Sequence, residues 1–253
     1  YSGGEIIVDS HHHFWDLSRF QYPWMTDKVA PLRRNYLPED MKPLLKATGV
    51  QQTVLVQAHQ SVEETHWLLE LAEANDFVGG VVGWVDLDSP DVGQVLDELV
   101  KHPKLKGIRH LVHDEKDDSW LMRADVRRGL AEVAKRNLTY DLLVRPQHLR
   151  FIPLLAEMVP GLRMVVDHIA KPPIASGQLE PWASRIAAVA AIPGMYCKIS
   201  GMVTEANWSR WTVEDLKPYV HHVVEKFGFD RVMWGSDWPV CTLAAPYQRV
   251  LES

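Results

Sequence analysis

Short apolar, β-branched runs alternate with amphipathic stretches along nearly the whole length of this 253-residue chain. Runs of this kind, bounded by turn residues, are typical of strands, whereas apolar positions three and four residues apart are typical of helices. The expected strands are residues 5–10, 52–58, 77–87, 104–111, 138–144, 162–168, 195–200 and 230–237. The expected helices are residues 63–76, 89–102, 122–137, 147–160, 181–193 and 212–228.

This alternation predicts an α/β fold. Strands separated by helices pair in parallel, and eight such units in about 250 residues predict a single-domain (β/α)₈ TIM barrel over residues 1–253. The alternative is an open doubly wound sheet, but no Gly-rich phosphate loop follows the first strand. Residues 16–50 are expected to form an extended first βα loop. The last outer helix is expected to be short or missing, because only 16 residues follow Asp237.

Composition and charge narrow the class of protein. The chain is 46% hydrophobic and 24% charged, which is ordinary for a globular domain, and its net charge of −6 argues weakly against nucleic acid as a partner. No apolar run approaches the ~20 residues of a membrane span. Cys197 and Cys241 form no metal or redox motif, so we expect a reducing compartment. These features predict a cytoplasmic protein that binds neither nucleic acid nor membranes.

Polar residues stand where the expected strands end, which is where a barrel carries its active site. They are His11, His13, Gln57, Arg109, Asp167, His168, Lys198, Ser200 and Asp237. Because side chains two apart on a strand share a face, His11 and His13 are expected to point inward and His12 outward. His59, His110 and His113 stand alone in the sequence and are expected in loop or surface positions.

The inward histidines suggest a metal site. Together with His168 and Asp237 they would offer three nitrogens and one oxygen, a donor set suited to Zn²⁺ or a similar divalent ion. A His-x-His pair alone is equally compatible with hydrogen-bonded histidines at the barrel rim. The matching residues at two other strand ends favour a functional site.

The segments "VDSHHHFWD", "VVDHIAKP", "CKISG" and "WGSDWP" together resemble the amidohydrolase superfamily, specifically its amidohydrolase-2 branch. Within it the chain is most similar to hydrolases of sugar lactones such as fuconolactone and rhamnonolactone, with the pyrone-dicarboxylate lactonase a related member. The resemblance places the strand-1 histidine pair at His11 and His13, and further site residues at His168 and Asp237. It implies that Asp237 is the general base or proton shuttle in hydrolysis.

The resemblance also bears on the number of metal ions. Superfamily members with two ions carry a bridging Lys or Glu at strand 4 and a His at strand 5. Here strand 4 ends in Arg109, and strand 5, "TYDLLVRP", contains no His. We therefore expect one divalent ion at most, most simply zinc, or none, since some lactonases of this branch work without metal.

Lactone hydrolysis assigns a task to each candidate residue. Asp237 would take a proton from water and return it, assisted by His168, while the histidines, with or without zinc, would polarise the carbonyl. Arg109 could hold a carboxylate or hydroxyl. The remaining substrate-binding candidates are Gln57, Ser200, Trp24 and Trp238. Their structural alternatives are a rim salt bridge for Arg109, loop hydrogen bonding for Gln57 and Ser200, and simple packing for the tryptophans.

Two further functions remain open at this stage. Related amidohydrolase-2 members are decarboxylases or hydratases that use a similar zinc set, and a non-catalytic binding barrel is also compatible with the fold. The expected partner is a small-molecule lactone, and the oligomeric state is not predicted.

Lys198 is unusual for a barrel interior. Period-2 alternation places it inward, where an unpaired ammonium is costly, so we expect Asp9 or Asp141 to pair with it.

Overall fold

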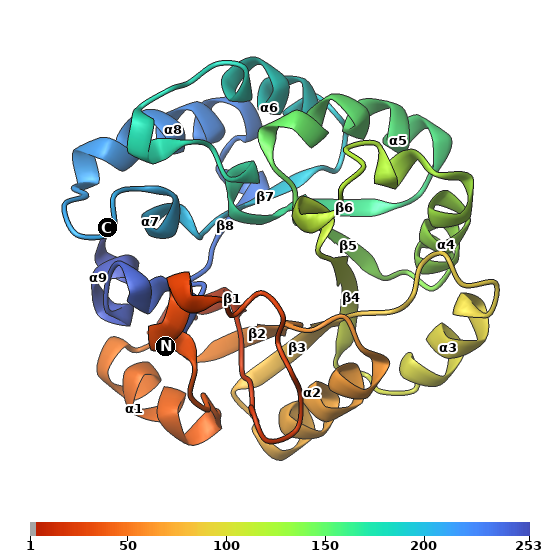
Figure 1. Ribbon diagram of the computed structural model, residues 1–253, viewed down its shortest axis with the longest axis horizontal. Helices are drawn as coiled ribbons and strands as arrows, with labels where there is room; N and C mark the ends of the chain where they lie inside the picture. Colours follow the sequence, from red (N-terminus) through yellow and green to blue (C-terminus); the bar gives the residue numbers. More distant parts are fainter. Residues whose placement is uncertain (1–3) are drawn as a thin grey trace.

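The computed structural model describes residues 4–253 and shows eight parallel strands paired in chain order. The helices lie outside this ring of strands (Figure 1). The strands are β1 Val8–His12, β2 Gln52–Val56, β3 Val78–Gly83, β4 Leu105–His110, β5 Thr139–Leu142, β6 Arg163–Val166, β7 Tyr196–Ile199 and β8 Val232–Trp234. The expected single-domain (β/α)₈ barrel is confirmed. Strands β2 to β8 lie within their expected runs, and β1 overlaps its expected run.

The barrel closes between β1 and β8 close to their carboxyl ends. The amide of Asp237 donates to the carbonyl of His11 over 2.8 Å, and the amide of His13 donates to the carbonyl of Trp238 over 2.7 Å. At the opposite end of β1, Val8 is exposed. The closure therefore lies where the polar residues of β1 and β8 meet.

Nine α-helices are found among residues 4–253. They are α1 Pro38–Thr48, α2 Val62–Ala74, α3 Val92–Leu99, α4 Ala124–Lys135, α5 Ile152–Met158, α6 Trp182–Ala190, α7 Met202–Glu205, α8 Val213–Phe227 and α9 Tyr247–Glu252. None of the helices in this part of the chain has the length and apolar character needed to span a membrane.

The helix expected over residues 147–160 is divided. A 3₁₀ helix covers Pro146–Phe151, and α5 begins only at Ile152. Pro153 explains the break, because its ring clashes with the preceding turn and it lacks an N–H, so it is tolerated only at the start of a helix. Within residues 16–50, expected to be loop, a 3₁₀ helix covers Asp27–Leu32, and α1 starts at Pro38 for the same reason.

Helix α2 illustrates how the sequence sets an outer helix. The hydroxyl of Ser61 accepts a hydrogen bond from the amide of Glu64 and so caps the first turn. Trp67, Leu68 and Ala72 share one face and are buried against the sheet, as their spacing predicts.

The first loop folds over the mouth of the barrel around an aromatic cluster. Trp15 is fully buried, and its indole N–H donates to the carbonyls of Leu32 and Arg34. Its ring centroid lies 5.3 Å from those of both Trp24 and Tyr36. These contacts fix the loop, and with it Trp24, above the strand ends.

Candidate active site

Four of the predicted residues converge at the carboxyl ends of the strands. Asp237 Oδ1 lies 3.2 Å from His13 Nε2, 3.7 Å from His11 Nε2 and 3.8 Å from His168 Nε2. The Nε2 atoms of His11 and His13 are 3.2 Å apart, and all four side chains are buried. His12 instead contacts Thr53 Oγ1 at 2.8 Å, on the outer side of the strand.

The backbone at two of these residues is strained. Asp237 has φ 57°, and the four consecutive residues from His168 to Lys171 have φ between 45° and 63°. Left-handed conformation is uncommon outside glycine, and for the β-branched Ile169 it is a clear outlier. Such strain clusters at functional sites, where the surrounding structure must hold it.

Hydrogen bonds to Nδ1 orient each imidazole. His13 Nδ1 donates to the carbonyl of Val56 over 2.8 Å, which leaves the lone pair of Nε2 facing Asp237. His168 Nδ1 lies 2.7 Å from Ser200 Oγ. Partners of this kind fix the tautomer and orientation of functional histidines.

His11 has two charged neighbours at Nδ1. The ammonium of Lys198 lies 3.1 Å away and Asp167 Oδ2 lies 3.7 Å away. At 3.7 Å, Asp167 is too distant to accept a hydrogen bond from Nδ1. Because an ammonium only donates, the contact with Lys198 places the hydrogen of the neutral ring on Nε2, which faces the site.

A divalent ion fits this donor set. Tetrahedral zinc with bonds of 2.0–2.1 Å separates neighbouring ligand atoms by about 3.3 Å, close to the distances between the donor atoms of His11, His13 and Asp237. The Nη1 atom of Arg109, 3.4 Å from His11 Nε2, is a competing positive charge.

The electrostatics keep Asp237 ionised and His11 and His168 neutral. Burial alone would raise the pKa of Asp237, but its contacts with His168 and His13 outweigh it, so the pKa lies below its ordinary value. Burial lowers the pKa of His168 to about 4 and holds that of His11 well below its ordinary value. A carboxylate that can accept a proton thus faces imidazoles that can donate or accept hydrogen bonds.

Lys198 points into the barrel beneath this cluster, as predicted. Its ammonium lies 2.6 Å from Asp141 Oδ2 and 3.2 Å from Asp167 Oδ1. The expectation that Asp9 could be its partner is wrong. Asp9 accepts hydrogen bonds from Ser236 and from the hydroxyl of Tyr247 at the junction of β1 and β8, because the register of β1 shifts between Asp9 and His12 and α9 brings Tyr247 within reach.

Above the cluster lies a cavity of about 350 Å³ that reaches Asp237, His13, His168 and Arg109. Trp24, one of the substrate-binding candidates, lines it. Apolar side chains from the first loop, β2 and the segment after β8 line one side. These are Val29, Leu32, Ala58, Val240 and Leu243.

Three other substrate-binding candidates lie elsewhere. Gln57 is fully buried, and its side-chain and main-chain oxygens accept hydrogen bonds from Arg109. Ser200 contacts His168, and Trp238 is buried against Phe14 and Tyr36. None of the three lines the cavity, because each is held in the layer below it or behind it. They orient or support residues of the site instead.

The cavity lining also contains charged side chains, which sequence reasoning did not anticipate. The loops after β4 to β7 contribute His113, Asp114, Arg145, Lys171 and Glu205, and the first loop adds Lys28. His113, expected to be an isolated loop residue, is within 3.2 Å of Asp114. Strand alternation cannot place loop residues, so the only available signal was Lys171, which lies inside the segment "VVDHIAKP".

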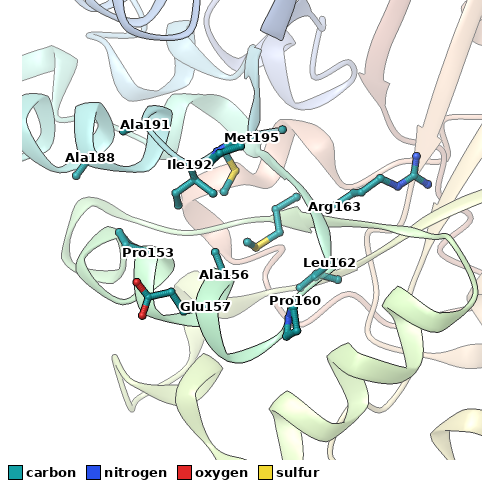
Figure 2. Close-up of a pocket in the computed structure, with 14 residues that line it drawn as sticks. Pro153, Ala156, Glu157, Pro160, Leu162, Arg163, Ala188, Ala191, Ile192 and Met195 are labelled. Carbon is teal, nitrogen blue, oxygen red and sulfur yellow. The ribbon is translucent and has the colours of Figure 1, made fainter.

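A larger cavity of about 630 Å³ lies on the outside of the barrel, between α5, α6 and the beginnings of β6 and β7. Figure 2 shows it lined largely by Pro, Ala, Ile and Met side chains, with the Arg163 side chain extending away. It contains none of the converging histidines, which line or lie beneath the cavity at the strand ends instead.

Comparison with known proteins agrees with this geometry. The amidohydrolase family model matches residues 8–252. An L-fucono-1,5-lactonase from Burkholderia ambifaria is 40% identical over 240 residues, which covers 95% of this chain and 82% of that protein. An L-fucono-1,5-lactonase from Burkholderia multivorans is 35% identical over 257 residues, which covers 98% of this chain and 86% of that protein.

Two solved amidohydrolase structures are also similar to this chain. A Burkholderia multivorans amidohydrolase with bound HEPES superposes with a TM-score of 0.91 at 35% identity, covering 98% of this chain and 90% of that chain. A second structure from the same organism, with bound zinc, gives a TM-score of 0.89 at 36% identity, covering 98% and 89%.

Proposed function

Because this chain belongs to the amidohydrolase family, we propose that it hydrolyses a sugar-derived lactone by attack of water on the ester carbonyl. The observation that carries this proposal is the contact of one ionised carboxylate, Asp237, with three imidazoles at the floor of a cavity. A volume of about 350 Å³ suits a small molecule. The similarity to two L-fucono-1,5-lactonases supports a sugar lactone as the substrate.

Asp237 acts as the general base in this proposal. It takes a proton from water as the oxygen of that water bonds to the carbonyl carbon, and it returns the proton to the ring oxygen as the carbon–oxygen bond of the ring breaks. The product is an open-chain hydroxy acid, which ionises at neutral pH and releases one proton to the solvent. The lowered pKa of Asp237 keeps it in the basic form before the reaction.

The neighbouring residues orient the carbonyl. His168, held by Ser200, and Arg109, held by Gln57 and Asp167, both reach the cavity. A guanidinium and an imidazole N–H stabilise negative charge on the carbonyl oxygen as water adds. Because their supporting partners are buried, this arrangement exists before substrate binds.

We further propose that His11, His13, His168 and Asp237 can hold one zinc ion. When bound, such an ion supplies Lewis-acid polarisation and lowers the pKa of a coordinated water. A second ion is not expected, because β4 offers Arg109 and β5 offers no histidine at this level. Elemental analysis of the purified protein should give at most one equivalent per chain, and two equivalents bound in the barrel mouth would contradict this.

The decisive experiment is a panel of sugar lactones assayed with a pH indicator, with and without a chelator. Ring opening releases one proton and no CO₂, whereas a decarboxylase releases CO₂. Absence of turnover across the panel would overturn the lactonase proposal.

Cys197 and Cys241 are both free and buried, which supports the further proposal of a reducing, cytoplasmic location.

A further inference from the structure

The loop after β6 brings a partly buried lysine to the cavity. Lys171 ends the left-handed run that starts at His168, with φ 50° and ψ 59°. The run is fixed in two ways: the amide of Lys171 donates to the carbonyl of His168 over 2.8 Å, and the indole of Trp182 in α6 donates to the carbonyl of Ile169 over 2.6 Å. Ile169 and Trp182 are both fully buried.

A carboxylate from the next loop faces this lysine. Glu205, the last residue of α7, places Oε1 3.9 Å from Lys171 Nζ, and the two side chains are 17% and 22% exposed. This separation is too long for a hydrogen bond. Within residues 4–253, neither charged side chain forms a hydrogen bond, and both line the cavity.

The chemistry of the pair selects its ligand. An ammonium only donates hydrogen bonds and a carboxylate only accepts them, whereas a hydroxyl does both. A hydroxyl between them can accept from Lys171 and donate to Glu205. An anionic substituent would be repelled by Glu205 and a cationic one by Lys171. The cavity lining also holds the cations Lys28 and Arg145 and the carboxylate Asp114.

We propose that Lys171 and Glu205 together bind a hydroxyl group of the substrate and select neutral, hydroxylated lactones over unsubstituted ones. This inference rests on the proposed lactonase function, and it adds a specificity site to the lining of the cavity. The left-handed turn positions residues at both ends of the site. In this proposal it places His168 near the lactone carbonyl and Lys171 near the substrate hydroxyl. Trp182 is then a positioning residue for both.

The test compares binding of two unreactive ring analogues, a polyhydroxylated δ-lactam and δ-valerolactam, by calorimetry. Lys171→Met and Glu205→Met should each weaken binding of the hydroxylated lactam about 10- to 100-fold, the range for a hydrogen bond to a charged group, and that of δ-valerolactam less than about threefold. Because one hydroxyl bridges both residues, the double variant should lose little more than the larger single loss.

Lys101→Met is the control, since it removes a cation that pairs with Glu98 on the surface and does not line the cavity. Binding of both lactams should then stay at the wild-type level. Equal loss for the two lactams in Lys171→Met, or fully additive losses in the double variant, would overturn the inference. The matching kinetic test compares hydrolysis of L-fucono-1,5-lactone and δ-valerolactone by the same variants. If selective lactam binding persists in a protein that opens no lactone, the proposed reaction is wrong while the hydroxyl site stands.

Discussion

The ammonium of Lys198 lies 2.6 Å from Asp141 Oδ2, inside the barrel and beneath the three histidines. The same ammonium contacts Asp167 and His11, so one cation satisfies two buried carboxylates and one imidazole. Removing it would leave Asp141 without an ion-pair partner and Asp167 with Arg109 alone, which is far more costly than the net contribution of the ion pair.

Lys198→Met should therefore lower the free energy of unfolding by about 3–5 kcal/mol. Chemical denaturation measures this. Lys101→Met is the matched control, because Lys101 pairs with Glu98 on the surface with both side chains about two-thirds exposed, and it should change stability by less than about 1 kcal/mol. Equal effects of the two substitutions would refute the buried network as a source of stability.

Asp237→Asn tests the general base. The amide has nearly the same shape but cannot accept a proton at neutral pH, so kcat should fall about 10²- to 10⁴-fold while the melting temperature remains close to that of the wild type. Steady-state kinetics on the best lactone of the panel and a thermal melt decide the outcome. Retention of more than about a tenth of wild-type kcat would remove Asp237 from this role.

Trp182→Phe tests the left-handed turn. Phenylalanine keeps most of the ring packing against Tyr219 but loses the donor to Ile169. The turn should relax, and kcat/KM should fall about tenfold or more, because the loss of a buried hydrogen bond partner costs about 1–3 kcal/mol. Trp211→Phe is the control, since its indole donates to the carbonyl of Ala244 over 3.0 Å. If both variants lose activity only in proportion to their loss of stability, Trp182 has no positioning role.

Glu64 gives a pH-dependent prediction. It is fully buried, its Oε1 accepts from the amides of Ala58 and His59, and burial raises its pKa from 4.5 to about 8. Between these two values the folded state keeps a proton that the unfolded chain has lost. The contribution of Glu64 to stability should therefore decline as pH rises from about 4.5 to 8.

Glu64→Gln removes this titration and keeps an oxygen acceptor for the two amides. Urea denaturation at pH 5, 6, 7 and 8 should show a flatter pH dependence for the variant than for the wild type. Parallel curves for the two proteins would mean that Glu64 is ionised in the folded state at neutral pH. Below pH 4.5 the carboxyl is protonated in both states, so the two curves should run parallel there.

The sequence alone determined the barrel and the inner part of its site. Strand runs of period 2 and helix runs of period 3.6 are local patterns, so the eight strands and the inward direction of His11, His13 and Lys198 follow from them. Even here one partner was misassigned, because the irregular register of β1 turns Asp9 toward Ser236 and Tyr247. Such a shift has no signature in a single strand.

Only the tertiary structure decided the outer part of the site. Side chains in loops do not alternate with a regular period. Nothing in the sequence therefore indicated that Lys171 and Glu205 would lie close together in the cavity lining. The sequence also does not show how far below the cavity a side chain lies. Gln57, Ser200 and Trp238 have side chains that could bind a substrate. The fold instead places Gln57 against Arg109, Ser200 against His168 and Trp238 in the core. The left-handed turn from His168 to Lys171 opposes local backbone preference, and it exists because buried contacts such as that of Trp182 outweigh its strain.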